Sequence, residues 1–112
     1  MTAPVLRSKE LEKHIEAYLV HRVEGCGGLA YKFTSPNRVN VPDRIVLIPW
    51  NAGWDTNIQK GKTVFVELKA PGKEPTSGQL REHNRLLHLG FPVYVIDSKL
   101  GVDRFMKAEF NK

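Results

Sequence analysis

Residues 63–70 read Thr63-Val64-Phe65-Val66-Glu67-Leu68-Lys69-Ala70. Apolar residues occupy both alternating positions of this stretch, as in a strand that is buried on both faces in the middle of a sheet. Glu67 and Lys69 stand near its end, and strand periodicity places them side by side on one face. Burying these two charges is costly unless they pair with each other or bind an ion. The stretch alone leaves a plain ion pair and an ion-binding site equally open.

A second acidic residue stands in a comparable setting upstream. Residues 41–48 read Val41-Pro42-Asp43-Arg44-Ile45-Val46-Leu47-Ile48, so Asp43 opens another β-branched, apolar segment. A hairpin between the two segments would bring Asp43 close to Glu67. Two carboxylates at the end of a buried sheet favour the ion-binding interpretation over the plain ion pair.

Length and composition narrow the class of protein. The 112 residues are enough for one hydrophobic core and too few for two, so we expect a single domain over residues 1–112. No apolar run approaches the length of a membrane span, and the first residues lack the apolar centre of a signal peptide. The single cysteine, Cys26, excludes an internal disulfide and a cysteine-built zinc site, which fits a reducing cytoplasm.

The charge balance bears on the partner. The chain has 17 Lys and Arg against 12 Asp and Glu, a net charge of +5. Such a charge favours a polyanion such as DNA or RNA, although many small basic proteins gain only solubility from it.

A first helix is expected from Ser8 to about Val23, because apolar residues recur there at four-residue steps. Ser8 is the predicted N-cap. Glu12 and Glu16 lie beside the apolar stripe, and pairing with neighbouring lysines is the simpler interpretation of both acids when the helix is taken alone.

A second helix is expected from Thr76 to about Leu89, with Thr76 and Gln79 forming a capping box. Its inward side is predicted to carry Leu80, Asn84 and Leu87. The spacing of the histidines matches no zinc motif, so surface or packing roles are expected for His14, His21, His83 and His88.

The remaining segments complete an α-β-β-β-α-β order. Strands are expected at 29–33 and 91–97, and residues 101–112 have the pattern of a short amphipathic helix. The long loop over residues 50–62 carries two predicted packing anchors, Trp50 and Trp54. A right-handed crossover through the second helix makes the last strand parallel to residues 63–70, and the first three strands are expected to be antiparallel neighbours. We therefore predict an α/β sandwich with a mixed sheet.

The ordered motifs resemble a known nuclease family. Pro42-Asp43 followed by Glu67-Leu68-Lys69 is similar to the PD-(D/E)XK nuclease signature. Further motifs narrow the resemblance, namely a first helix with Glu16, the runs 27–33 and 64–72, and Gln79. Together with the signature they resemble the VRR-NUC (virus-type replication-repair nuclease) family in its small, stand-alone, phage-type form. The resemblance covers nearly the whole chain and implies a restriction-endonuclease-like sandwich.

The resemblance also implies hydrolysis of phosphodiester bonds with Mg²⁺ or Mn²⁺. Carried over onto this sequence, the metal ligands would be three carboxylates and one backbone carbonyl, from Glu16, Asp43, Glu67 and Leu68. Glu12 is the second choice for the acid of the first helix. Lys69 would position the attacking water, and Gln79 would act in catalysis or orient the site.

The family's partners are implied in the same way. Stand-alone members act as homodimers on branched DNA such as four-way (Holliday) junctions, here in the cytoplasm of a bacterial host cell. Candidates for contacts to the DNA backbone, each of which suits a solvated surface equally well, are Lys32, Arg38, Arg44, Lys73, Arg81 and Arg85. The competing interpretation is a DNA-binding module that keeps the fold without catalysis. A third is an interaction protein that uses the tryptophan loop.

One position departs from the family pattern. The family has glycine two residues before the proline, where this chain has Asn40. Because asparagine tolerates left-handed backbone geometry better than other non-glycine residues, we expect the turn to be kept.

Overall fold

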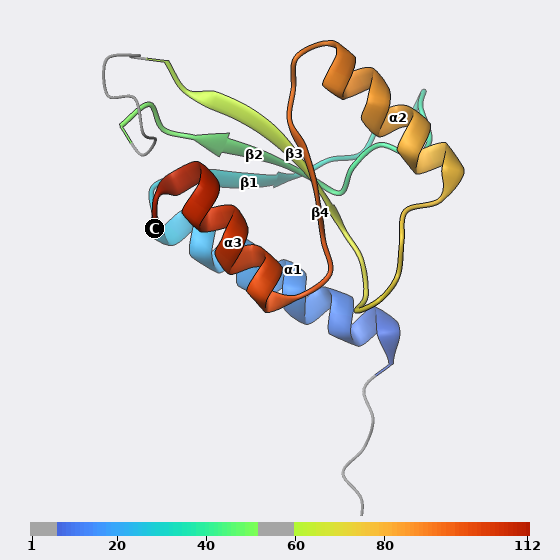
Figure 1. Cartoon of the computed structure of the whole chain (residues 1–112), viewed down its shortest axis with the longest axis horizontal. Helices are drawn as coiled ribbons and strands as arrows, with labels where there is room; N and C mark the ends of the chain where they lie inside the picture. The colour runs from blue at the N-terminus through green and yellow to red at the C-terminus, as the bar shows by residue number, and fades with distance from the viewer. Residues whose placement is uncertain (1–6, 52–59) are drawn as a thin grey trace, which may run out of the picture.

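The computed structural model describes residues 7–51 and 60–112. In chain order they form α1 (Ser8–Gly25), β1 (Leu29–Lys32), β2 (Arg44–Ile48), β3 (Lys62–Leu68), α2 (Ser77–His88), β4 (Val93–Ile96) and α3 (Lys99–Phe110), as Figure 1 shows. The predicted α/β architecture and its α-β-β-β-α-β order are confirmed. The C-terminal helix lies two residues earlier than the sequence indicated and begins at Lys99 rather than Gly101, because the Ser98 hydroxyl caps it by accepting a hydrogen bond from Gly101 N at 2.9 Å.

The four strands form one mixed sheet in the order β1-β2-β3-β4. β1 pairs with β2 and β2 with β3 in antiparallel fashion, whereas β3 and β4 are parallel, as predicted. In the register of the central hairpin, Arg44 lies opposite Val66. Asp43, one residue before β2, therefore lies across from Glu67 on β3.

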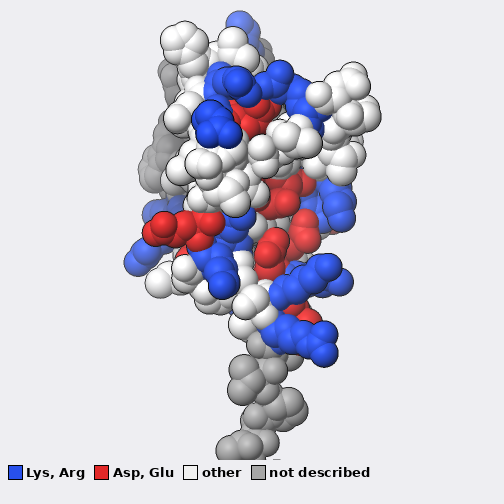
Figure 2. Space-filling view, turned by 90° about the vertical axis from the view of Figure 1, so that its right-hand side faces the viewer, with Lys and Arg blue, Asp and Glu red and all other residues white. Residues whose placement is uncertain are grey.

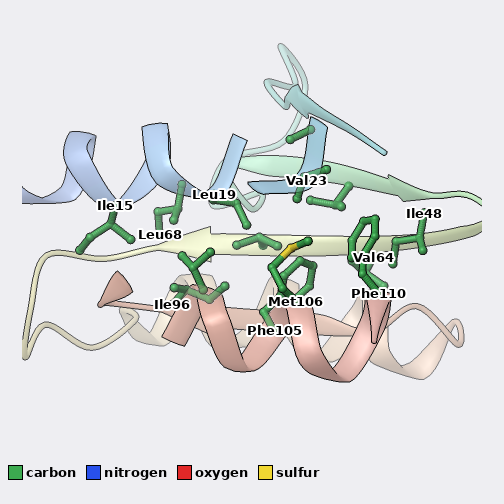
Figure 3. Close-up of a cluster of buried hydrophobic side chains, with 14 residues drawn as sticks. Ile15, Leu19, Val23, Ile48, Val64, Leu68, Ile96, Phe105, Met106 and Phe110 are labelled. Carbon is green, nitrogen blue, oxygen red and sulfur yellow. The ribbon is translucent and has the colours of Figure 1, made fainter. Parts of the chain in front are cut away.

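One face of the sheet packs against α1 and α3 (Figure 3). Val64, Val66 and Leu68 alternate along β3 and point into this layer, where Leu19, Val23 and Phe110 are fully buried. The buried side chains also include Ile15, Val46, Ile48, Ile96, Val102, Phe105 and Met106. Strand alternation then sends Glu67 to the opposite face.

That opposite face meets α2, and here the prediction for the helix was wrong. Leu80 and Leu87 are 48% and 50% exposed, whereas Glu82 and His83 are buried. Asn84 is exposed as well. The apolar pattern misled because the strand end that α2 covers carries the carboxylate of Glu67, and a buried carboxylate requires polar partners from the helix above it.

Both ends of α1 are defined by local hydrogen bonds. Ser8 is the first helical residue and not the N-cap, because the N–H of Arg7 donates to Glu10 Oε2 at 3.0 Å. At the other end Gly27 adopts a left-handed φ of 84°, and Gly28 N donates to Val23 O at 3.0 Å, as in a Schellman motif. The helix thereby turns directly into β1.

No helix in the described ranges, 7–51 and 60–112, has the length and hydropathy needed to cross a membrane. Trp50 is 45% exposed at the end of β2, and Trp54 lies outside the described residues.

Candidate active site

Asp43 is held in place by backbone groups on both sides. Its carbonyl accepts a hydrogen bond from Phe33 N at 2.8 Å, and its Oδ2 accepts one from Leu68 N at 2.6 Å. The turn before it is set by Asn40, whose φ of 67° confirms the left-handed geometry expected at that position. These contacts fix the carboxylate of Asp43 at the end of β3.

Glu67 is buried between β3 and α2, with 2% of its surface exposed. Its two oxygens contact two residues one helical turn apart on α2. Gln79 Nε2 donates to Oε2 at 3.5 Å, and His83 Nε2 lies 3.2 Å from Oε1. The first turn and the middle of α2 therefore hold this carboxylate in one orientation.

The carboxylates of Asp43 and Glu67 are in contact, and their charges conflict. Burial raises the pKa of Glu67 to about 8, and a side-chain hydrogen bond to Asp43 and the charge of Asp43 add to this shift, while Lys69 opposes it. At neutral pH without a bound cation, Glu67 therefore keeps its proton. The pair is poised to exchange that proton for a positive ion.

The two acids of α1 have different surroundings. Glu16 Oε2 accepts a hydrogen bond from Arg44 Nε at 2.9 Å, because strand alternation sends Arg44 to the α1 side of the sheet. Glu12, one turn earlier, lies within electrostatic reach of Asp43 and Lys69. Burial, and next the charge of Asp43, raise the pKa of Glu12. Glu12 is thus under the electrostatic influence of Asp43 and Lys69, whereas Glu16 is paired with Arg44.

Lys69 and His83 complete the cluster. Burial lowers the pKa of His83, and the nearby ammonium of Lys69 lowers it further, so the imidazole is neutral at physiological pH. The charge of Lys69 acts on Glu12, Glu67 and His83 alike, so its ammonium lies within electrostatic range of all three.

Gln79 combines the two roles that the sequence left open. Its N–H donates to Thr76 Oγ1 at 3.2 Å, and its Oε1 accepts from Thr76 N at 2.9 Å, which is the predicted capping box. The other half of the same side-chain amide reaches Glu67. The helix cap therefore also orients a side-chain donor toward the site.

The candidate DNA-contacting residues fall into two groups. Arg44 is occupied inside the protein, since it also donates to the carbonyl of Ala30 at 2.9 Å and its side chain is only 18% exposed. The other five are exposed at the surface, namely Lys32, Arg38, Lys73, Arg81 and Arg85. Figure 2 shows basic side chains gathered around acidic ones over the region of α2, with further acidic side chains lower on the same face.

The carboxylates of Asp43 and Glu67 are candidate ligands for a divalent metal ion. Across residues 7–51 and 60–112, no group of three or more His, Cys, Asp or Glu side chains is arranged to hold a metal. Two contacting carboxylates, one buried and one partly buried, nevertheless fit a hard cation such as Mg²⁺, which retains several waters and commonly takes only one or two carboxylates from the protein. The residues present therefore fit Mg²⁺ or Mn²⁺ better than a metal that needs a full set of protein ligands.

His83 is the site residue that the sequence interpretation missed. The spacing of the four histidines matches no zinc motif, and this gave no reason to single out His83. In the structure His83 is buried, whereas the other three histidines are exposed. The usable signal was its position four residues after Gln79, which places both side chains on the same helix face.

Comparison with protein-family models gives no match. A phage protein named "Putative nuclease p44", from Acyrthosiphon pisum secondary endosymbiont phage 1, is 51% identical over 88 residues, which cover 79% of this chain and 84% of that protein. A solved structure named "VRR_NUC domain" is similar with a TM-score of 0.73 and 32% identity, covering 87% of this chain and 95% of that one.

Proposed function

This chain belongs to the VRR_NUC family, and from that premise we propose that it is a nuclease that hydrolyses phosphodiester bonds in DNA with a divalent metal ion. We infer further that residues 1–112 act as one nuclease domain. The observation that carries the proposal is the contact between the carboxylates of Asp43 and Glu67. A site that holds the buried acid Glu67 against a second, partly buried acid is destabilised without a cation and gains stability when one binds.

Each residue of the cluster has a role in this chemistry. Asp43 and Glu67 bind the ion, and the extended backbone of β3 directs the carbonyl of Leu68 to the same side as its N–H, toward Asp43. Bound Mg²⁺ or Mn²⁺ supplies charge neutralisation at the phosphate and a water of lowered pKa. Lys69 stabilises the developing negative charge of the attacking oxygen.

We propose that Gln79 and His83 position Glu67. A carboxylate that is hydrogen-bonded at both oxygens cannot rotate away when the ion or the substrate arrives. A third acid, from α1, adds negative charge beside Asp43. Glu12 is favoured for this role over Glu16, because the charge of Glu16 is neutralised by Arg44.

The substrate and assembly follow from the family resemblance. We propose a branched DNA substrate such as a four-way junction, cut by a homodimer whose two-fold axis would place two sites on opposing strands. The reaction would take place in the cytoplasm of a bacterial host. The exposed basic side chains on the α2 side of the site would contact the DNA backbone.

The proposal is tested by cleavage of labelled DNA by the wild type and by Asp43→Asn. The substrates are a four-way junction, a flap, a plain duplex and a single strand, each with Mg²⁺, Mn²⁺ or EDTA. We expect metal-dependent cleavage by the wild type, fastest on the junction, and its loss in Asp43→Asn. A wild-type protein that binds the junction tightly in every condition without cutting it would instead be a binding module that retains a nuclease fold.

A further inference from the structure

A polar hollow lies close to the candidate active site, along another side of α2. It has a volume of about 410 Å³ and lies between the loop before β2 and α2. Its lining consists of Asn37, Arg38, Val39, Asn40, Gly78, Arg81, Glu82 and Arg85. Because Gln79 and His83 face Glu67 from the same helix, the hollow and the site share one element.

The hollow is organised by a single buried carboxylate. Arg38 donates to both oxygens of Glu82 through Nε and Nη2, each at 2.8 Å, and Arg85 Nη1 donates to Oε1 at 2.9 Å. The hydrogen bonds from Arg38 hold the pKa of Glu82 down at about 2, so it stays ionised. Glu82 therefore fixes two guanidinium groups that would otherwise move freely in solvent.

The hollow nevertheless keeps a surplus of positive charge. Three guanidinium groups face one carboxylate, and Arg81 makes no ion pair with any residue in the described parts of the chain. The side chains of Arg38 and Arg85 remain 52% and 63% exposed, so their free N–H groups reach solvent. A concave surface with two uncompensated positive charges attracts an anion more strongly than a flat one does.

The backbone is adapted to keep the hollow in place. A Cβ added at Gly78 would lie 2.6 Å from Asn40 Nδ2, so the glycine allows the loop to approach the first turn of α2. The bidentate contact of Arg38 with Glu82 ties the same loop to the second turn. Arg38 therefore lies on a loop that is fixed against α2, and Arg81 and Arg85 lie on α2 itself.

We propose that this hollow binds one phosphate of the DNA backbone, a few nucleotides from the phosphate that is cut, and so sets where the strand lies over the site. The inference rests on the proposed nuclease function. Arg81 and Arg85 supply the contacts, while Arg38 and Glu82 act chiefly as the brace. Planar guanidinium groups suit this role because they bind phosphate oxygens in pairs.

The test compares Arg81→Gln and Arg85→Gln with a control, Arg104→Gln, which removes an exposed arginine from α3. DNA binding is measured with Ca²⁺ in place of Mg²⁺, on four-way junctions in which one backbone phosphate at a time is replaced by a neutral methylphosphonate. At one or two adjacent positions we expect the replacement to weaken wild-type binding about 10-fold, the effect of one lost charged hydrogen bond. Arg81→Gln should bind weakly already and show no further loss at those positions.

Salt dependence gives a second readout. The slope of log affinity against log salt should fall by about one unit in Arg81→Gln and stay unchanged in Arg104→Gln. If Arg81→Gln loses affinity at the same methylphosphonate positions as the wild type, or keeps the wild-type slope, the hollow does not hold a phosphate. Cleavage by the wild type and its loss in Asp43→Asn would still support the nuclease function, so the two proposals fail separately.

Discussion

At the scale of single residues, Glu12 and Glu16 show how one helical turn separates a site residue from a structural one. Glu16 is neutralised by Arg44, whereas Glu12 lies within electrostatic range of Asp43 and Lys69. The sequence offered both acids, and the resemblance placed Glu16 first. Only the direction of the Arg44 side chain, set by strand alternation, distinguishes them.

The two acids should therefore respond differently to the same substitution. Glu12→Gln is expected to lower cleavage at limiting Mg²⁺ by about 10- to 100-fold, the range for groups that support a metal site. Its melting temperature should stay close to that of the wild type. Glu16→Gln is expected to keep activity while the free energy of unfolding falls by about 1–3 kcal/mol, because Arg44 loses its charged partner. Equal activity losses in both variants would refute this assignment.

The carboxylate pair also predicts a pH dependence. Between the ordinary pKa of Glu67, 4.5, and its raised value of about 8, the folded chain holds a proton that the unfolded chain has released. Each rise in pH across this window therefore favours unfolding, and stability in EDTA should fall from pH 5 to pH 8. Thermal unfolding of Glu67→Gln, which has no proton to lose, should show a flatter profile, as should the wild type in saturating Mg²⁺. A wild-type stability that rises over this range in EDTA would contradict the raised pKa of Glu67.

At the scale of elements, α2 differs most from what its sequence indicated. Its leucines gave an apolar pattern, yet the helix turns Gln79, Glu82 and His83 inward and leaves Leu80 and Leu87 half exposed. A buried polar face of this kind serves function at some expense of stability.

Substitution of His83 tests its contact with Glu67. His83→Leu leaves one oxygen of the buried Glu67 without its partner, so we expect a lower melting temperature together with slower cleavage and a higher Mg²⁺ requirement. His83→Gln keeps a donor for Glu67 and should retain more activity than His83→Leu. The measurements are thermal unfolding and the Mg²⁺ dependence of cleavage. Wild-type cleavage by His83→Leu at limiting Mg²⁺ would remove His83 from the site.

The strands show why the fold was more predictable than the site. β2 spans the five residues expected, Arg44–Ile48, and the hairpin with β3 places Asp43 beside Glu67 as predicted, because local alternation and a two-strand register suffice. The inward face of α2 could not be predicted locally, since it depends on which strand end the helix covers. His83 meets Glu67, 16 residues away in sequence, and Glu82 meets Arg38, 44 residues away, so neither contact can be read from local spacing.

At the scale of the whole molecule, the two faces of the sheet are covered unequally. α1 and α3 cover one face, whereas α2 lies over one end of the other (Figure 1). Leu89, just after α2, is 70% exposed and borders a hollow of about 370 Å³. One side of this hollow is apolar, with Phe33, Val41 and Leu86, and the other is polar, with Ser35, Arg38, Glu82 and Arg85. The exposed leucine and the apolar side suit contact with another apolar surface.

If the protein acts as a homodimer through this surface, Leu89→Asp should dissociate it. Sedimentation equilibrium is expected to give twice the chain mass of 12.7 kDa for the wild type and a single chain for Leu89→Asp. Leu100→Asp, at a position 57% exposed on α3, is the matched control and should leave the mass unchanged. A wild-type protein that sediments as a monomer, with and without junction DNA, would rule out the dimer.

Leu68 belongs to two regions of the molecule at once. Its side chain is 1% exposed in the core, and its backbone N–H donates to Asp43 at 2.6 Å. An amide proton so close to a carboxylate is strongly deshielded, so its NMR resonance should lie far downfield of the other amides. A cation that draws charge from Asp43 would move this one signal upfield. The amide resonance of Leu68 would therefore report the binding of the proposed metal ion, without substrate and without an added label.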